Sequence, residues 1–323
     1  MLVPPYNQNN KILYYLKNYV RFWFPASLYR RELGRILASA MDDDVGRRVG
    51  YYNKMAQSVQ LPDNAETIAK YFRRPPKKRR TYFFDTYEYI KYFKPHYRFF
   101  SVSGDLVKVP LSPSIVKSRP ILGDNQNSVL LNLNKIRHFR FLNDRIPTKD
   151  KLNKLVWRGN AFVRRQNRIT FLQRYYGHPS CNIGKVNKTG DYADQWLAPR
   201  MAINEQLKYK YILCLEGNDV ATNLKWVMSS NSVAVMPRPK YETWFMEGTL
   251  IPNVHYIEIK DDYSDLEEKI NHYENHPLEL QQIITDAHRH VAQFFDPHKE
   301  KVIALLVLKK YFELTGQYDA PAI

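Results

Sequence analysis

KYKYILCLEGNDVATNLKWVMSSNSVAVMP, residues 208–237, is the stretch that decides the fold. Its apolar run 211–215 predicts a buried strand, residues 216–219 interrupt the pattern, and 221–229 return at helical spacing before a second apolar run, 232–236. Two parallel strands joined in this way leave the turn at the carboxyl end of the first strand, beside the start of the helix. Backbone N–H groups and the helix dipole there favour an anion, most often a phosphate. Such a unit is also a common structural support, so binding and purely structural roles both stay open.

A second predicted strand end, upstream of this stretch, adds positive charge. Residues 155–160 read LVWRGN, a short apolar run closed by Arg158 and Gly159. The next predicted helix carries three further cations, Arg164, Arg165 and Arg168. Because the planar guanidinium matches phosphate oxygens in two-point contacts, arginines at a strand end predict a diphosphate site.

Composition indicates a globular protein long enough for two domains. The chain has 323 residues, of which 44% are hydrophobic and 14% aromatic. No run reaches the roughly 18 apolar residues that a membrane-spanning helix needs, and the amino terminus lacks the pattern of a secretory signal. The two cysteines, Cys181 and Cys214, form no disulfide framework. We therefore expect a cytoplasmic protein with a domain boundary near residue 150.

Positive charge is concentrated in the first half of the chain. Residues 1–150 hold 27 Lys and Arg against 12 Asp and Glu, a net of +15, whereas the remainder holds 22 against 20, a net of +2. Such a field attracts an anionic partner, whether nucleic acid, an acidic membrane leaflet or a phosphorylated glycolipid. The alternative is a basic protein that its charge merely keeps soluble.

Two segments of this basic half are candidate contact surfaces. Residues 11–24 (KILYYLKNYVRFWF) predict an amphipathic helix, which could lie in a membrane interface or pack on the protein's own core. Residues 73–80 (RRPPKKRR) carry six cations in eight residues. Nucleic-acid phosphates could bind there, but no zinc-finger spacing, RNA motif or recognition helix accompanies the run. We expect this basic loop to face anionic lipid or an anionic sugar, with a merely solvated loop as the alternative.

Another predicted strand end places a carboxylate where a catalytic base belongs. The run 98–102 predicts a strand, and Ser-Gly-Asp follows it, so Asp105 is expected at the carboxyl edge of a sheet. A turn-forming aspartate is the alternative. Further on, Lys117 and Arg119 are expected in a loop that contacts phosphate or is only solvated. His138 has no second histidine at metal-ligand spacing, so it is structural or contacts the acceptor.

Several other elements follow from the periodicity. We expect a solvated acidic turn at 42–44, helices at 49–59 and 64–72, a loop-rich insertion at 177–199, and a final helix at 299–315.

The order of these motifs resembles glycosyltransferase family ninety, which contains capsule-associated transferases, animal protein O-glucosyltransferases and bacterial lipopolysaccharide core transferases. The resemblance covers roughly residues 98–295, and it rests on the order and spacing of five motifs instead of any single one. They are WRG with its trailing arginines, YKYILCLEGNDVATNLKW, SVAVMP, ETWF and HYIEI.

The resemblance implies an α/β fold of the GT-B type, with two Rossmann-like domains and a cleft between them. Residues 1–150, helical at the start, would bind the acceptor, and residues 151–323, ending in a helix that crosses back, would bind the nucleotide sugar. It implies an inverting transfer of glucose or galactose from a UDP-sugar, with Asp105 at the position of the general base. The candidate donor-binding residues, taken from the strand ends, turns and cations described above, are Arg158, Gly159, Arg164, Arg168, Glu216, Gly217, Asn218, Asp219, Asn223 and Lys225; those for the acceptor are Lys117, Arg119 and His138.

The expected partners are a UDP-sugar, the anionic inner core of lipopolysaccharide and the cytoplasmic face of the inner membrane, with no nucleic acid. A capsule polysaccharide is the near alternative acceptor, and a basic nucleic-acid-binding protein is the distant alternative. No isolated Asp-x-Asp stands in a strand-end loop, so we expect no metal and no cofactor. Asn223 departs from the family, because eukaryotic relatives carry an arginine before the Leu-Lys pair, and this leaves the phosphate partner open.

Overall fold

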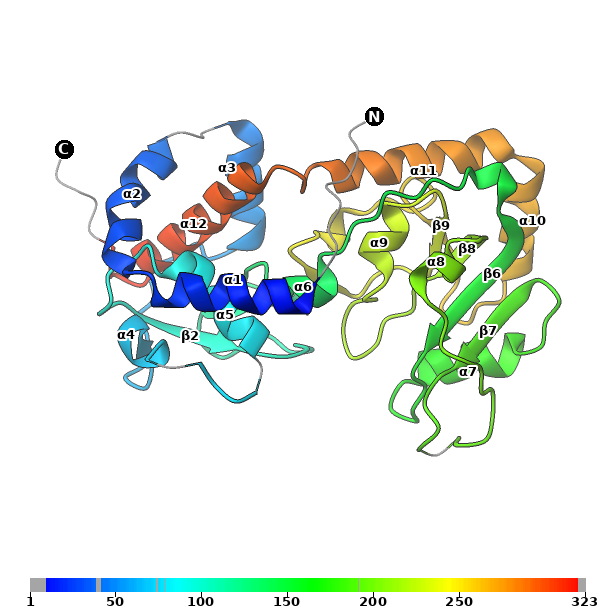
Figure 1. Ribbon diagram of the computed structural model, residues 1–323, viewed down its shortest axis with the longest axis horizontal. Coiled ribbons are helices and arrows are strands. Elements are labelled where there is room, and N and C mark those ends of the chain that lie inside the picture. The colour runs from blue at the N-terminus through cyan, green and yellow to red at the C-terminus, as the bar shows by residue number, and fades with distance from the viewer. Residues whose placement is uncertain (1–9, 39–41, 74, 79, 191, 319–323) are drawn as a thin grey trace. The chain divides into compact units, whose positions relative to one another are not determined.

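The structure, a computed structural model, describes residues 10–38, 42–73, 75–78, 80–190 and 192–318. The chain divides into two compact units. The N-terminal unit consists of Gln8–Phe139, Lys240–Met246 and Asp296–Ile323, and the C-terminal unit consists of Arg140–Pro239 and Glu247–Phe295, so far as these ranges are described. Helices and parallel strands occur in both units (Figure 1), so the predicted α/β class is confirmed. The binding roles predicted for residues 1–150 and 151–323 stay predictions.

The C-terminal unit is built on a five-stranded parallel sheet in the order β11-β9-β8-β6-β7. Its strands are β6 (Leu152–Gly159), β7 (Cys181–Lys185), β8 (Tyr209–Leu213), β9 (Val233–Met236) and β11 (Ile257–Glu258). Its helices are η1 (Thr148–Asp150), α7 (Gln166–Tyr175), α8 (Ile203–Gln206), α9 (Leu224–Met228), η2 (Glu247–Thr249), α10 (Leu266–Asn275) and α11 (Pro277–Ala292). The central strands β8 and β9 are largely buried apolar runs, as expected for a parallel sheet with covered faces.

The organising stretch folds largely as its pattern predicts. Strands β8 and β9 pair in parallel, with Tyr211 opposite Val233, and the turn lies at the carboxyl end of β8. The helix between them is shorter than predicted, because residues 222–223 form a turn and α9 contains only five residues. A helix this short has a small dipole, so its amino end contributes little to anion binding.

The N-terminal unit combines helices with two small sheets. Its strands are β1 (Glu66–Thr67), β2 (Arg98–Val102), β3 (Ser114–Val116), β4 (Ser118–Pro120), β5 (Ser128–Leu130) and β10 (Tyr241–Thr243). Its helices are α1 (Lys11–Trp23), α2 (Ala26–Ala38), α3 (Asp43–Tyr52), α4 (Ile68–Tyr71), α5 (Arg80–Ile90), α6 (Lys135–His138) and α12 (Pro297–Leu314). In the order β1-β2-β3-β5, strands β2, β3 and β5 are parallel, while β10 pairs antiparallel with β4.

The bounds of two predicted helices in this unit, 49–59 and 64–72, are wrong. The acidic run is not a free turn: Asp42 accepts a hydrogen bond from the Val45 amide at 2.7 Å and starts α3, which ends at Tyr52 instead of running over 49–59. Acidic side chains stabilise the first turn of a helix, which explains the shift. The helix predicted over 64–72 is preceded by strand β1, and only α4 is helical.

Two segments predicted as loops contain strands. Residues 117–120 include β4, which pairs with β10, a strand that is distant in the sequence. The insertion 177–199 contains β7, the edge strand of the large sheet. Both strands are short and mixed in polarity, so their partners cannot be read from a local pattern.

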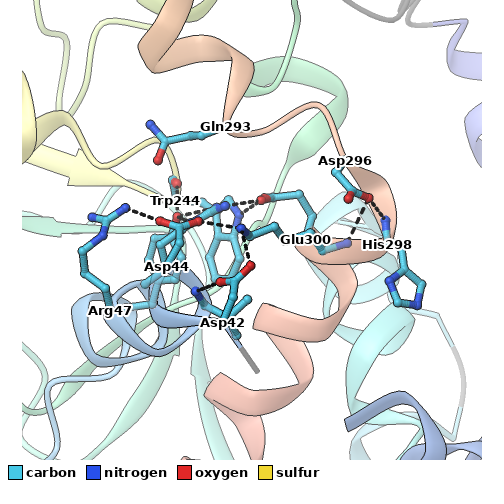
Figure 2. Close-up of polar contacts among 12 residues, drawn as sticks. Asp42, Asp44, Arg47, Trp244, Gln293, Asp296, His298 and Glu300 are labelled. Carbon is cyan, nitrogen blue, oxygen red and sulfur yellow. Dashed lines mark hydrogen bonds and ion pairs between the residues drawn. The ribbon is translucent and has the colours of Figure 1, made fainter. Parts of the chain in front are cut away.

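Helix α12 confirms the predicted final helix, and a buried polar network holds it in the N-terminal unit (Figure 2). Glu300 forms an ion pair with Arg48 at 2.6 Å and accepts a hydrogen bond from the Trp244 indole at 2.6 Å. The Tyr52 hydroxyl accepts from Arg48 at 2.9 Å and donates to the Trp244 carbonyl at 2.8 Å. A buried ion pair and hydrogen bonds therefore connect α3, the segment at Trp244 and α12, which lie far apart in the sequence.

In the part of the chain that the structure describes, no helix combines the length and the apolar character needed to cross a bilayer.

Candidate functional site

The strongest candidate site of the C-terminal unit lies at the carboxyl ends of β6 and β8. After β8 the chain passes through Cys214 and Leu215 into the turn 216–219, and after β6 it turns at Asn160 toward α7. In open α/β sheets, ligands bind at this edge, where the loops after adjacent strands meet.

Arg168, on the first turn of α7, joins the two loops. Its guanidinium donates to the carbonyls of Glu216 at 3.1 Å, Asn160 at 2.9 Å and Leu215 at 3.0 Å. Burial and the neighbouring Arg165 lower the pKa of Arg168 to about 10, so it stays charged at neutral pH. Among the described residues, no carboxylate forms an ion pair with Arg168. The site therefore holds a desolvated positive charge with neutral partners, which favours an anionic ligand.

A second arginine stands beside the first. The guanidinium of Arg165 lies 3.4 Å from the side-chain oxygen of Asn218, and its Cζ lies 5.7 Å from the centre of the Phe162 ring. A Cβ atom placed on Gly217 would lie 3.3 Å from Arg168 Nη2 and 3.9 Å from Arg165 Cζ. Glycine at 217 thus lets two guanidinium groups approach the backbone of the loop.

Strand β6 supports this arrangement through a close backbone contact. A Cβ atom on Gly159 would lie 2.4 Å from the Trp157 ring, so only glycine leaves room for this indole. The guanidinium carbon of Arg168 lies 5.6 Å from the centre of the same ring. Gly159 therefore leaves room for the indole against which Arg168 packs, and its predicted donor contact stays a prediction.

Arg158 lies apart from this arginine pair. Side chains alternate between the faces of a strand, so Arg158 projects from the face opposite Trp157, against which Arg168 packs. There it donates to the Pro199 carbonyl at 3.0 Å and to the carbonyl and side-chain oxygens of Asn182 at 2.8 and 2.7 Å. These bonds connect β6 to β7 and to the segment after it. Because they occupy the guanidinium, they disfavour the predicted diphosphate contact.

Four other predicted donor residues lie apart from the arginine pair or have structural partners, and their donor contacts stay predictions. Lys225 is fully buried and forms an ion pair with Glu247, so its ammonium is already neutralised below the surface. Asn223 donates to the Leu213 carbonyl at 2.9 Å and fixes the start of α9 to the end of β8. Asp219 is buried within the turn, whereas Arg164 is exposed with its Cζ 5.6 Å from the centre of the Phe162 ring. The structure therefore brings together Arg168, Glu216, Gly217 and Asn218, and it adds Arg165.

Asp105 lies at the carboxyl edge of the parallel strands of the N-terminal unit, and the predicted strand 98–102 is confirmed as β2. The chain turns at Gly104, which has a φ of 120° and so takes a conformation that glycine favours. The Asp105 carboxylate accepts from the Lys117 ammonium at 2.7 Å. Its side chain is 30% exposed, whereas that of Lys117 is 1% exposed. The buried lysine therefore orients a carboxylate that solvent or substrate can reach.

The predicted acceptor-binding residues are buried. Arg119 pairs with Glu242 at 2.7 Å and donates to the carbonyls of Ser128 at 2.9 Å and Tyr51 at 2.6 Å. His138, at the end of α6, is also buried, and Lys117 is occupied by Asp105. Arg119 thus has the environment of a structural cation, and the predicted acceptor contacts of all three residues stay predictions that this burial disfavours.

One group of described residues has a geometry suited to a divalent cation: the exposed cluster of His272, His276 and Glu279, whose ligand atoms lie within 4.8 Å of one another. It lies at the other end of the large sheet, because Glu274 beside it pairs with Lys210 near the start of β8. It is therefore poorly placed to act on a ligand held by Arg165 and Arg168.

Of these functional candidates, Arg165 is the one that sequence reasoning left out of the donor site. Its spacing of three residues from Arg168 was the available signal, because such residues share a helix face.

Comparisons with known proteins identify relatives of this chain. Residues 132–317 match the family model described as Glycosyl transferase family 90. The chain is 43% identical over 270 residues to O-glucosyltransferase LpsA of Dichelobacter nodosus, an alignment that covers 84% of this chain and 83% of the relative. It is 29% identical over 117 residues to Protein O-glucosyltransferase 3 of Homo sapiens, covering 36% of this chain and 23% of that protein.

Proposed function

Because the chain belongs to glycosyl transferase family 90, we propose that it is an inverting transferase that moves a hexose from a UDP-sugar to the inner core of lipopolysaccharide. Both relatives carry the word glucosyltransferase in their names, which favours glucose over galactose as the sugar. The GT-B arrangement is part of this proposal, with the donor bound by the C-terminal unit and the base supplied by the N-terminal unit.

The observation that carries the proposal is the arginine pair at the carboxyl edge of the large sheet. A UDP leaving group carries its developing charge on the β-phosphate, and Arg165 and Arg168 lie where two guanidinium groups can neutralise it. Three backbone carbonyls accept hydrogen bonds from Arg168 but leave its charge unneutralised, so an anionic phosphate would add the missing opposite charge.

The proposed reaction is a single displacement. The Asp105 carboxylate removes the proton from an acceptor hydroxyl while that oxygen attacks the anomeric carbon. The bond from this carbon to the phosphate oxygen breaks, and its electron pair leaves with UDP. Attack from the side opposite the leaving group inverts the anomeric configuration.

The test of the donor site is the affinity for UDP measured by titration calorimetry. Arg165→Met and Arg168→Met should each weaken UDP binding about tenfold to 100-fold, since charge-assisted hydrogen bonds contribute about 1.5–3 kcal/mol. Arg174→Met is the matched control, because Arg174 is an exposed arginine on the last turn of the same helix. UDP affinities equal to that of the control would show that the diphosphate binds elsewhere.

Transfer should not depend on a metal ion, since the two guanidinium groups supply the positive charge that a metal would otherwise provide. We expect full transfer in the presence of a chelator and no gain on adding magnesium or manganese. Product formation from UDP-glucose with a core oligosaccharide measures this directly. Abolition by chelator, followed by recovery on adding metal, would contradict it.

A further inference from the structure

Helix α1 packs against α5 through only one of its faces. Phe22 lies 5.1 Å from Tyr87 between ring centres, and Tyr19 lies 4.9 Å from Phe84. The Tyr14 hydroxyl donates to Asp85 at 2.7 Å, which fixes the amino-terminal half of the helix. The predicted packing of residues 11–24 on the protein's own core is therefore confirmed for this aromatic face. Figure 1 shows α1 lying beside α5.

The opposite face of α1 is apolar and exposed. This exposed stripe consists of Ile12 (80% exposed), Leu13 (61%), Leu16 (60%), Val20 (57%) and Trp23 (79%). At about 100° per residue, the five side chains fall within an arc of about 100°. Phe24 and Leu28 extend the apolar surface toward the start of α2. Exposed residues scattered singly need no explanation, but a contiguous stripe marks an interaction surface.

Cations lie on both borders of the exposed stripe. Lys17, exposed, follows Leu13 and Val20 around the helix on one side. On the other side Tyr19 borders Ile12 and Trp23, and its hydroxyl accepts from Arg80 at 3.4 Å. Arg80 ends the basic run 73–80, whose other described cations, Arg73, Lys77 and Lys78, are exposed; residues 74 and 79 lie outside the described residues.

We propose that the exposed stripe of α1 docks in the plane of a bilayer surface that carries anionic lipid, with the bordering cations contacting the headgroups. An apolar face flanked by Lys and Arg, with a tryptophan at the edge, fits the boundary between headgroups and acyl chains. From Ile12 to Trp23 the stripe is about 17 Å long at 1.5 Å per residue, too short to span the hydrocarbon core. The helix therefore lies on the membrane.

This inference deepens the proposed function and rests on it only for the place of the acceptor. Lipopolysaccharide core is assembled on a lipid, so an acceptor-binding unit that docks on the bilayer meets its substrate at the surface. Donor binding and the chemical step do not require the stripe. The two proposals can therefore fail separately.

The test is sedimentation of the full chain with vesicles of phosphatidylcholine alone or with roughly one third phosphatidylglycerol. We expect binding to the anionic vesicles that weakens as salt rises. Leu16→Glu should weaken binding about tenfold or more, because it removes buried apolar area and adds repulsion. Leu278→Glu is the matched control, an exposed leucine at the start of α11 in the C-terminal unit, and should bind like the unchanged protein.

Tryptophan fluorescence gives a second measurement of docking, and it can be made on the unchanged protein. Trp23 is exposed, whereas Trp157, Trp226 and Trp244 are buried and Trp196 is half-buried. Brominated anionic lipid should quench emission in the unchanged protein, and Trp23→Phe should remove most of the quenching while keeping vesicle binding.

Three outcomes would overturn the inference: no binding of the unchanged protein to anionic vesicles, equal binding of Leu16→Glu, or equal binding to neutral and anionic vesicles. The first would leave a protein partner as the occupant.

Transfer to a lipid-free oligosaccharide should be unchanged in Leu16→Glu. Vesicle binding without any transfer would contradict the proposed function but not the docking surface. Transfer without vesicle binding would contradict the docking surface but not the proposed function.

Discussion

Asp105→Asn should lower the rate of hexose transfer about 100-fold or more while UDP affinity stays unchanged. Loss of a general base typically costs 10²–10⁴-fold. The amide keeps the size of the carboxylate and can still accept a hydrogen bond from Lys117, but it cannot take a proton from the acceptor. UDP affinity should be preserved, because the proposed diphosphate contacts come from Arg165 and Arg168 in the other unit.

Steady-state kinetics separates this role from a structural one. We expect kcat to fall with little change in the KM for the donor, as when an interaction made only in the transition state is lost. Asp63→Asn is a control, because Asp63 is a fully exposed aspartate of the same unit. A melting temperature is needed beside the rates, since the change leaves the buried ammonium of Lys117 without its anion. Weakened UDP binding with normal transfer at saturating donor would show that Asp105 is not the base.

The sequence was most informative where chemistry is local. The alternation of apolar runs and turns in 208–237 predicted β8, β9 and their parallel pairing, since burial on both faces leaves a continuous apolar run. The pattern at 98–105 predicted both β2 and the place of Asp105 at its end. Arg168 was also placed correctly beside the turn 216–219, because strand ends of one parallel sheet meet at one edge.

Residues whose partners are distant in the sequence could not be assigned in this way. Lys225 was predicted to bind the donor, but Glu247 pairs with it within the core. Arg119 was read as a loop residue, yet Glu242, which lies 123 positions later in the chain, pairs with it. The diphosphate contact of Arg158 stays a prediction. The local pattern does not say which face of β6 the helix α7 covers, and this decides which arginine reaches the strand-end loop.

The same limit applies to α1. Its sequence left membrane binding and packing on the core as alternatives, since both need an apolar face. The structure shows that the helix has apolar side chains on two sides, an aromatic face on α5 and an aliphatic stripe in solvent. The apolar residues of one helix thus form two surfaces. Only the position of α5 shows which of them is packed and which is exposed.

Arg48→Met should lower the free energy of unfolding of the N-terminal unit by about 3–5 kcal/mol. The substitution keeps most of the apolar stem but leaves Glu300 buried without its cation, and an unpaired buried charge carries this penalty. Arg47→Met is the matched control one residue earlier in α3. Arg47 pairs with Asp44 at the surface (Figure 2), and loss of an exposed pair costs about 1 kcal/mol or less. Urea denaturation followed by circular dichroism measures both.

The pH dependence of the stability of Arg48→Met shows whether the unpaired Glu300 carboxylate causes the loss. Burial raises the pKa of the Glu300 carboxyl above its usual range, and loss of the Arg48 cation removes the interaction that opposes this rise. The destabilisation should therefore be complete above the raised pKa and shrink as the pH falls through the ordinary value of about 4.3, below which the carboxyl is neutral in both states. Adding Glu300→Gln to Arg48→Met should likewise recover part of the stability at neutral pH, because the amide still accepts from Trp244 and carries no charge. A deficit that is independent of pH and is not reduced in the double variant would mean that lost packing, not the stranded carboxylate, destabilises the fold.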